Sequence, residues 1–265
     1  MPRLMILLAA LSLAANAFAQ PDVATIIQRS VEANRLDWEA APNYDRFERD
    51  LQPDGSTRTS EVMMIWGSDY YRLVAVNDKP LSPEEQAAEQ QRLEQVIAQR
   101  QNESPAQRAQ RTAKYQKNLK RNHMLIEQLT VAFDFKLLGE KKLGAYDVYE
   151  LEATPRPGYK PPSTETKVLT GMRGKLWVDK QTYQWVKVEA EVIHPVSIMG
   201  FLARVEPGTR FELEEMPVED GIWLPKHFSM EAHAKVFFVF SHKEQEEETY
   251  FDYHKASYPG QPKAQ

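Results

Sequence analysis

The sequence contains no cysteine among its 265 residues. Disulfide bonds are therefore excluded, and no thiol near the N-terminus can receive a lipid anchor. Long apolar runs are also missing: the longest, residues 4–15, is shorter than the roughly 20 residues that a membrane-spanning helix needs. Together these absences exclude a disulfide scaffold and a bundle of membrane helices.

Catalytic and nucleotide-binding motifs are missing as well. The chain has no nucleophile elbow, no phosphate-binding loop and no GxGxxG, and its six histidines lack metal-ligand spacing. A formal net charge of −5 provides no basic footprint for nucleic acid. We therefore predict a protein that is not an enzyme, binds no cofactor or metal and has no nucleic-acid partner. A paired-acid hydrolase stays open, because such carboxylates meet only in three dimensions.

The N-terminus has the pattern of a secretory signal. Arg3 precedes the apolar run, and the small-x-small ending Ala17-Phe18-Ala19 predicts cleavage before Gln20. A permanent anchor helix is the rival interpretation. We predict a signal peptide at 1–19 and a mature protein exported to the periplasm.

Two regions have helical patterns. Residues 22–40 space their apolar side chains as an amphipathic helix does, with Asp22 placed as its N-cap. The glycine-free stretch 82–128 is rich in Gln, Glu, Arg and Ala, and Ser-Pro pairs at Ser82 and Ser104 predict two helix starts. Its apolar content is thin, so we expect a helical hairpin insertion that largely faces water. A partner-binding arm is the alternative.

The rest of the chain alternates with period two, as strands do. The clearest example is "HFSMEAHAKVFFVF", residues 227–240, and a hairpin is predicted over 173–193. We also expect a strand over 129–137 and a turn at 219–221. Nine to eleven strands in one antiparallel sheet are predicted, and a sheet that large must curl or gain a second layer. The acidic residues at 244–248 are assigned to a sheet edge or a solvated face.

Two connecting segments stand out. The stretch 154–171 holds four prolines and no apolar period, which is typical of a long loop, either a lid or a plain surface excursion. The stretch 194–208 places several apolar residues where a hairpin tip is normally polar. It indicates an apolar rim, or else a strand that continues through 198–206.

Several segments together resemble a known family. "MRGKLWVDKQTYQWVKVEAEV", then "FLARVEPGTRFELEEMPVEDGIWLPKHFSM", and a closing alternating strand with "YFDY" are similar to the periplasmic lipoprotein-carrier superfamily that includes LolA and LolB. The resemblance covers mainly residues 129–254. It implies an α+β fold, in which a curved antiparallel sheet forms an unclosed β-barrel around helices, with an apolar cavity that accepts acyl chains.

The resemblance gives the predicted organisation and function. We expect a single lipid-binding domain over 20–265 with the helical insertion at about 82–128. Its function would be to bind or carry lipid or lipoprotein acyl chains, in outer-membrane lipoprotein sorting or lipid trafficking, with an inner- or outer-membrane protein as a possible partner. The alternative is a periplasmic sensor or scaffold that uses the helical arm to bind a protein.

The candidate cavity-lining residues are apolar side chains on one parity of the predicted strands. They are Val62, Met64, Trp66, Phe133, Phe135, Val186, Val188, Phe211, Leu213, Phe228, Met230, Ala232 and Val236.

Overall fold

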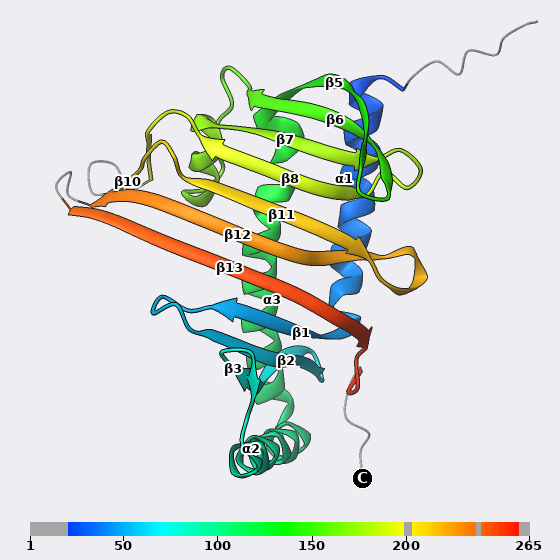
Figure 1. Cartoon of the computed structure of the whole chain (residues 1–265), viewed down its shortest axis with the longest axis vertical. Helices are drawn as coiled ribbons and strands as arrows, with labels where there is room; N and C mark the ends of the chain where they lie inside the picture. Colours follow the sequence, from blue (N-terminus) through cyan, green and yellow to red (C-terminus); the bar gives the residue numbers. More distant parts are fainter. Residues whose placement is uncertain (1–20, 199–202, 237–239, 260–265) are drawn as a thin grey trace, which may run out of the picture.

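One antiparallel sheet forms most of the molecule. The computed structural model describes residues 21–198, 203–236 and 240–259. Its strands follow the order β4-β3-β2-β1-β13-β12-β11-β8-β7-β6-β5, with β9 and β10 attached beside β12. No pairing joins the two outermost strands, β4 and β5, within the described residues. The fold is therefore α+β with an unclosed sheet, as the sequence predicts (Figure 1).

The strand count exceeds the prediction of nine to eleven, because three very short strands complete the sheet. The strands are β1 (Tyr44–Leu51), β2 (Thr57–Ile65), β3 (Ser68–Val76), β4 (Lys79–Pro80), β5 (Phe133–Leu143), β6 (Tyr146–Pro155), β7 (Met172–Asp179), β8 (Trp185–Val192), β9 (Val196–Ser197), β10 (Ala203–Val205), β11 (Arg210–Pro217), β12 (Trp223–Val236) and β13 (Phe240–Lys255).

Four α-helices and three short 3₁₀ segments accompany the sheet. They are α1 (Val23–Ala40), α2 (Pro83–Gln101), α3 (Pro105–Glu127), α4 (Leu129–Ala132), η1 (Ala41–Asn43), η2 (Glu165–Gly171) and η3 (Glu219–Gly221). In the described part of the chain, no helix combines the length and the apolar content that a membrane span requires.

Helix α1 covers one face of the sheet, which we call the inner face. Its N-cap is Asp22, whose Oδ1 accepts from the Thr25 N–H at 2.9 Å, as predicted. Ile26 and Ile27 of α1 are buried against side chains of β6, β7 and β8. Those sheet residues are Tyr149, Leu151, Leu176, Val178 and Trp185.

Helix α3 crosses the same face, and most of its described side chains are exposed, so the prediction that the helical hairpin largely faces water holds for it. In Figure 1, α1 and α3 both run behind the sheet, roughly across its strands. The Tyr115 hydroxyl of α3 lies 3.8 Å from the Met64 sulfur of β2, and η2 lies close to the C-terminal end of α3. Helix α2 packs on the opposite side of the β2–β3 hairpin, where Leu93 joins Met63 and Ile65. The hairpin of strands is thus held between two helices.

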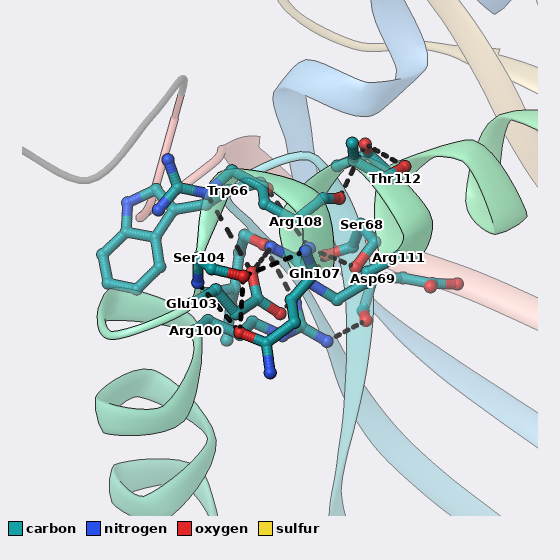
Figure 2. Close-up of polar contacts among 12 residues, drawn as sticks. Trp66, Ser68, Asp69, Arg100, Glu103, Ser104, Gln107, Arg108, Arg111 and Thr112 are labelled. Carbon is teal, nitrogen blue, oxygen red and sulfur yellow. Dashed lines mark hydrogen bonds and ion pairs between the residues drawn. The ribbon is translucent and has the colours of Figure 1, made fainter.

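A polar clamp attaches the α2–α3 junction to the β2–β3 turn (Figure 2). Arg100 donates to the carbonyls of Ile65, Ser68 and Asp69, each at 2.9 Å. Arg111 binds both carboxylate oxygens of Glu103 at 2.7 Å and also donates to the Trp66 carbonyl. The β2–β3 turn has left-handed geometry at Trp66, where φ is 45°. The two arginines donate hydrogen bonds to backbone carbonyls at and beside this turn. Polar contacts therefore position α3, and its thin apolar stripe gave no sign of this.

The start of β5 also differs from the prediction. Residues 129–132 form helix α4, and the strand begins only at Phe133. Val131 is half exposed, whereas Leu129 packs against two buried clusters, so this segment does not alternate as a strand would. The 154–171 stretch is a loop in its first part and ends in η2, whose Leu169 is buried.

Replacing Arg111 with Gln should lower the free energy of unfolding by about 2 kcal/mol, because the largely buried Glu103 carboxylate loses its bidentate partner. Chemical denaturation measures the change. Arg35→Gln is the control, since Arg35 pairs with Glu32 and Glu39 on an exposed helix surface and its loss should cost about 0.5 kcal/mol or less. Equal losses in the two variants would contradict the clamp.

Candidate functional site

The inner face carries a row of small side chains that crosses six strands. Cross-strand pairing connects Phe135, Ala153, Gly174, Ala190, Phe211 and Met230 in that order. We call these six the small-residue row. Its middle positions are two alanines and a glycine, while larger side chains stand at both ends, so the row forms the floor of a trough.

A second row of larger apolar residues runs beside the first. Its members, in the same strand order, are Leu137, Leu151, Leu176, Val188, Leu213 and Phe228. Helix α1 covers the β5–β8 end of this row, where Leu151 and Leu176 are buried. On β11 and β12, Leu213 and Phe228 are only half-buried, as are Phe211 and Met230 of the first row. The apolar surface is thus least covered between α1 and α3.

Two hollows adjoin along the small-residue row. A crevice of about 50 Å³ lies over Ala153, Gly174 and Ala190, with Leu129 of α4 and Leu169 of η2 above them. A cleft of about 850 Å³ opens between α1 and β5, with Val23, Ile27, Val31 and Phe135 as its apolar lining and Gln28, Glu32, Thr130, Asp134 and Arg156 as its polar lining. Phe135 lines both hollows, so the cleft at the open edge of the sheet lies next to the crevice.

A third cleft, of about 540 Å³, lies under the N-terminal half of α3. Arg46, Met64, Tyr71, Tyr250 and Tyr253 line it from the sheet. Arg111, Lys114 and Tyr115 line it from the helix. This cleft is polar, in contrast to the crevice.

Six of the thirteen predicted lining residues fall in the two rows. They are Phe135, Val188, Phe211, Leu213, Phe228 and Met230. Phe133 lines the crevice next to them. Val62 and Met64 also face inward but are buried beneath α3. Ala232 lies on the inner face two residues beyond Met230, and Val236 ends β12, where its backbone pairs with Ala203.

Two predicted residues lie on the other side of the sheet. A β-bulge between β7 and β8 places Trp185 against α1 and turns Val186 outward, where it packs with Trp177 and Trp223. Trp66 packs with Ile65 and Tyr258 on the α2 side. The bulge shifts the alternation by one residue, which a pattern of strict period two cannot reveal.

The apolar rim predicted at 194–208 is described only in part, because residues 199–202 lie outside the described ranges. The segments on either side form β9 and β10, which pair with each other.

An acidic cluster on the inner face is absent from the sequence prediction. Glu246 and Glu248 of β13 lie beside Met230 and Phe228, and Glu248 in turn faces Asp50 of β1. Glu48 lies one inward position further along β1 and is 6% exposed. The prediction that acids 244–248 lie on an edge or solvated face is therefore wrong for Glu246 and Glu248. In the sequence, Glu246 and Glu248 have the same parity along the strand as Tyr250, and this parity is the feature that could have indicated their inward position. The Tyr250 hydroxyl donates to Glu248.

Burial and like charges shift the pKa values of these groups. Burial raises the pKa of Glu48 to about 7, although Arg46 beside it opposes the shift. Burial and then the charge of Glu248 raise the pKa of Glu246 to about 7. The pKa of Asp50 is raised for the same two reasons. Near neutral pH the inner face can therefore gain or lose protons.

The acidic cluster is the only group within the described ranges whose carboxylates approach closely enough to share a metal ion. Oxygen atoms of Glu48, Asp50 and Glu248 lie within 4.8 Å of one another. Glu48 is already paired with Arg46, and Glu248 accepts from Tyr250. Three acids with these partners do not define a metal site, and we assign none.

The outer face is polar and its charges are paired across strands. A depression of about 820 Å³ there is lined by pairs such as Arg210–Glu231 and Arg173–Glu191. These side chains are largely exposed, so a solvated face explains them.

Several solved structures are similar to this chain at low sequence identity. A LolA superfamily protein from Nitrosomonas europaea, NE2245, is 12% identical, with 89% of this chain and 94% of that one covered at a TM-score of 0.34. A Vibrio parahaemolyticus domain named for outer membrane lipoprotein sorting is 12% identical, over 87% and 94%, at 0.33. A chain of the Pseudomonas aeruginosa MucA/MucB complex is 10% identical, over 89% and 100%, at 0.25.

No protein-family model and no curated protein sequence matches the chain. The structural likenesses are distant and concern the fold alone. What the protein binds must therefore be judged from its own inner face.

The stability of the protein should fall as the pH rises from about 4.5 to 7, because Glu48 loses its proton over this range. Its carboxyl group has a pKa of about 7 in the folded state against an ordinary value of 4.5, so the native state binds the extra proton over this range. Protonation therefore favours folding, and the contribution lost on deprotonation is on the order of 3 kcal/mol.

The Glu48→Gln side chain cannot ionise, so the unfolding free energy of this variant should decline less steeply with pH than that of the wild type. The variant also removes the ion-pair partner of Arg46, but this loss is the same at every pH. Denaturant unfolding at several pH values measures both slopes. Glu191→Gln, in an exposed outer-face pair, should keep the wild-type slope. A wild-type slope in Glu48→Gln would rule out this role.

Proposed function

We propose that the protein binds the acyl chain of a lipid or lipoprotein on its inner face and acts as a periplasmic carrier, in lipoprotein sorting or lipid trafficking. The observation that carries the proposal is the continuity of the apolar surface. It runs from the cleft between α1 and β5, over the small residues of the crevice, to the half-buried Phe211 and Met230. A trough of this shape fits a long, thin, apolar ligand.

The energetics favour such a ligand. Burying one methylene is worth about 0.8 kcal/mol, so a chain with about ten buried methylenes gains roughly 8 kcal/mol before ordering costs. The floor of the trough lacks large side chains at Ala153, Gly174 and Ala190. A ligand can therefore gain these contacts without first displacing core residues of the sheet.

Full burial requires the cover to move. The crevice of about 50 Å³ is too small for an acyl chain, and Leu129 and Leu169 close it from above. We infer that α1, or the α4 and η2 segments, shifts outward when the chain enters from the α1–β5 cleft. Such movement is a shift between a state in which the protein covers its own trough and one in which the ligand does.

The alternative function, a scaffold that binds a protein through a free helical arm, gains less support. Helix α3 belongs to the cover of the inner face and is fixed by the Arg100 and Arg111 clamp. Placement in the periplasm follows from the predicted signal peptide at 1–19, which lies outside the described residues.

Ala190→Leu tests the trough directly. The added methyl groups should occupy the crevice, so the variant should fold at least as stably as the wild type but bind a fluorescent fatty acid about tenfold more weakly. Fluorescence titration gives the dissociation constant and thermal unfolding gives the stability. Ala87→Leu is the matched control, because Ala87 is exposed on α2, away from the inner face, and its affinity should stay unchanged.

Two outcomes would contradict the proposal. One is wild-type protein that takes up no acyl probe under conditions where an established acyl carrier does. The other is an Ala190→Leu variant that is folded and binds with unchanged affinity.

A further inference from the structure

A buried polar cluster lies between the C-terminal half of α1 and the sheet. Asn34 and Asp37 of α1 meet Gln184, just before β8, and Glu215 of β11. All four residues are at most 7% exposed. The N-terminal half of α1, in contrast, packs through Ile26 and Ile27. The helix is thus held by apolar contacts at one end and by this cluster at the other.

In each of the two carboxyl groups, a single oxygen accepts all the hydrogen bonds. Asp37 Oδ1 accepts from the Trp223 N–H at 2.9 Å and from Gln184 Nε2 at 3.2 Å. Glu215 Oε1 accepts from Asn34 Nδ2 at 3.2 Å. The other oxygens, Asp37 Oδ2 and Glu215 Oε2, are buried without a hydrogen-bond partner. Two carboxyl groups in one apolar site cannot both be charged at an acceptable cost.

We propose that Asp37 and Glu215 share one proton, which acts as a latch that seats the C-terminal half of α1 on the sheet. The proton resides on Glu215, whose carboxyl group has a single hydrogen-bond donor, and it keeps a second charge away from Asp37. This inference does not depend on the identity of the ligand.

The surroundings support a proton rather than a metal ion. The two amides present their nitrogen atoms to the carboxylates, so their oxygens, Asn34 Oδ1 and Gln184 Oε1, point away and cannot complete a ligand shell around a shared cation. Those two oxygens also lack hydrogen-bond partners.

The titration of the pair follows from its neighbours. Burial and then the charge of Asp37 raise the pKa of Glu215 well above its usual value, and burial raises the pKa of Asp37 to about 6. Tyr253 of β13 also faces Glu215, but its hydroxyl donates to the Pro225 carbonyl. Within the described residues, no lysine, arginine or histidine contributes to the pKa of either acid. Loss of the shared proton therefore leaves two unneutralised charges under α1.

Hydrogen exchange of the α1 amides at residues 34–40 tests the latch. Above the pKa of the pair, protection factors in the wild type should fall by up to about tenfold per pH unit, the slope for one proton. Glu215→Gln has no ionisable proton at this position, so its protection should be independent of pH in that range. Glu214→Gln, on the adjacent outer-face residue, should behave as the wild type.

Infrared spectroscopy at pH 7 adds a direct observation. The wild-type minus Glu215→Gln difference spectrum should contain the C=O band of a protonated carboxyl group. If Glu215→Gln does not fold, Asp37→Asn should move the fall in protection to lower pH, because the charge that raises the pKa of Glu215 is gone. Three results would overturn the proposal: no such band, pH-independent protection in the wild type, or a shift in thermal stability when EDTA or calcium is added at fixed pH.

Discussion

The clamp between the α2–α3 junction and the β2–β3 turn is the constraint on which the architecture depends. Arg100 and Arg111 bind backbone carbonyls at a turn with left-handed geometry, and Glu103 neutralises one of them. This arrangement fixes where α3 begins and directs it across the inner face (Figures 1 and 2). Helix α3 then covers the polar cleft beside β1 and β2, while α1, α4 and η2 cover the apolar rows.

The inner face that results has two chemically different parts. Apolar rows occupy β5 to β8, β11 and β12, while carboxyl groups with raised pKa values line β13 and β1. Buried acids lower the stability of the protein when they ionise, and a crevice lined by glycine and alanine has fewer packing contacts than a filled core. Selection for stability alone would replace the acids and fill the crevice with larger side chains. Their presence on the same face is consistent with the proposal that this surface is covered in turn by the protein and by a ligand.

Much of this structure follows from the sequence, and the failures have physical causes. Asp22 and the apolar period predict α1, and alternation predicts most strands, because burial on one face imposes those patterns. The path of α3 was not predictable, since arginine contacts with backbone carbonyls impose no apolar period. The outward turn of Val186 needs the bulge beside Trp185, and the inner position of Glu246 needs the register of β13. Both depend on pairing between strands, which is set by the whole sheet.

Photo-crosslinking with a fatty acid that carries a diazirine in its acyl chain tests the central claim most directly. Alternate residues of β11 and β12 face opposite sides, so peptide mapping can resolve which side the ligand occupies. Adducts are predicted on Phe211 and Met230, and none on their neighbours Arg210 and Ser229. Adducts confined to the outer-face neighbours, or their complete absence at saturating ligand, would contradict an acyl-binding inner face.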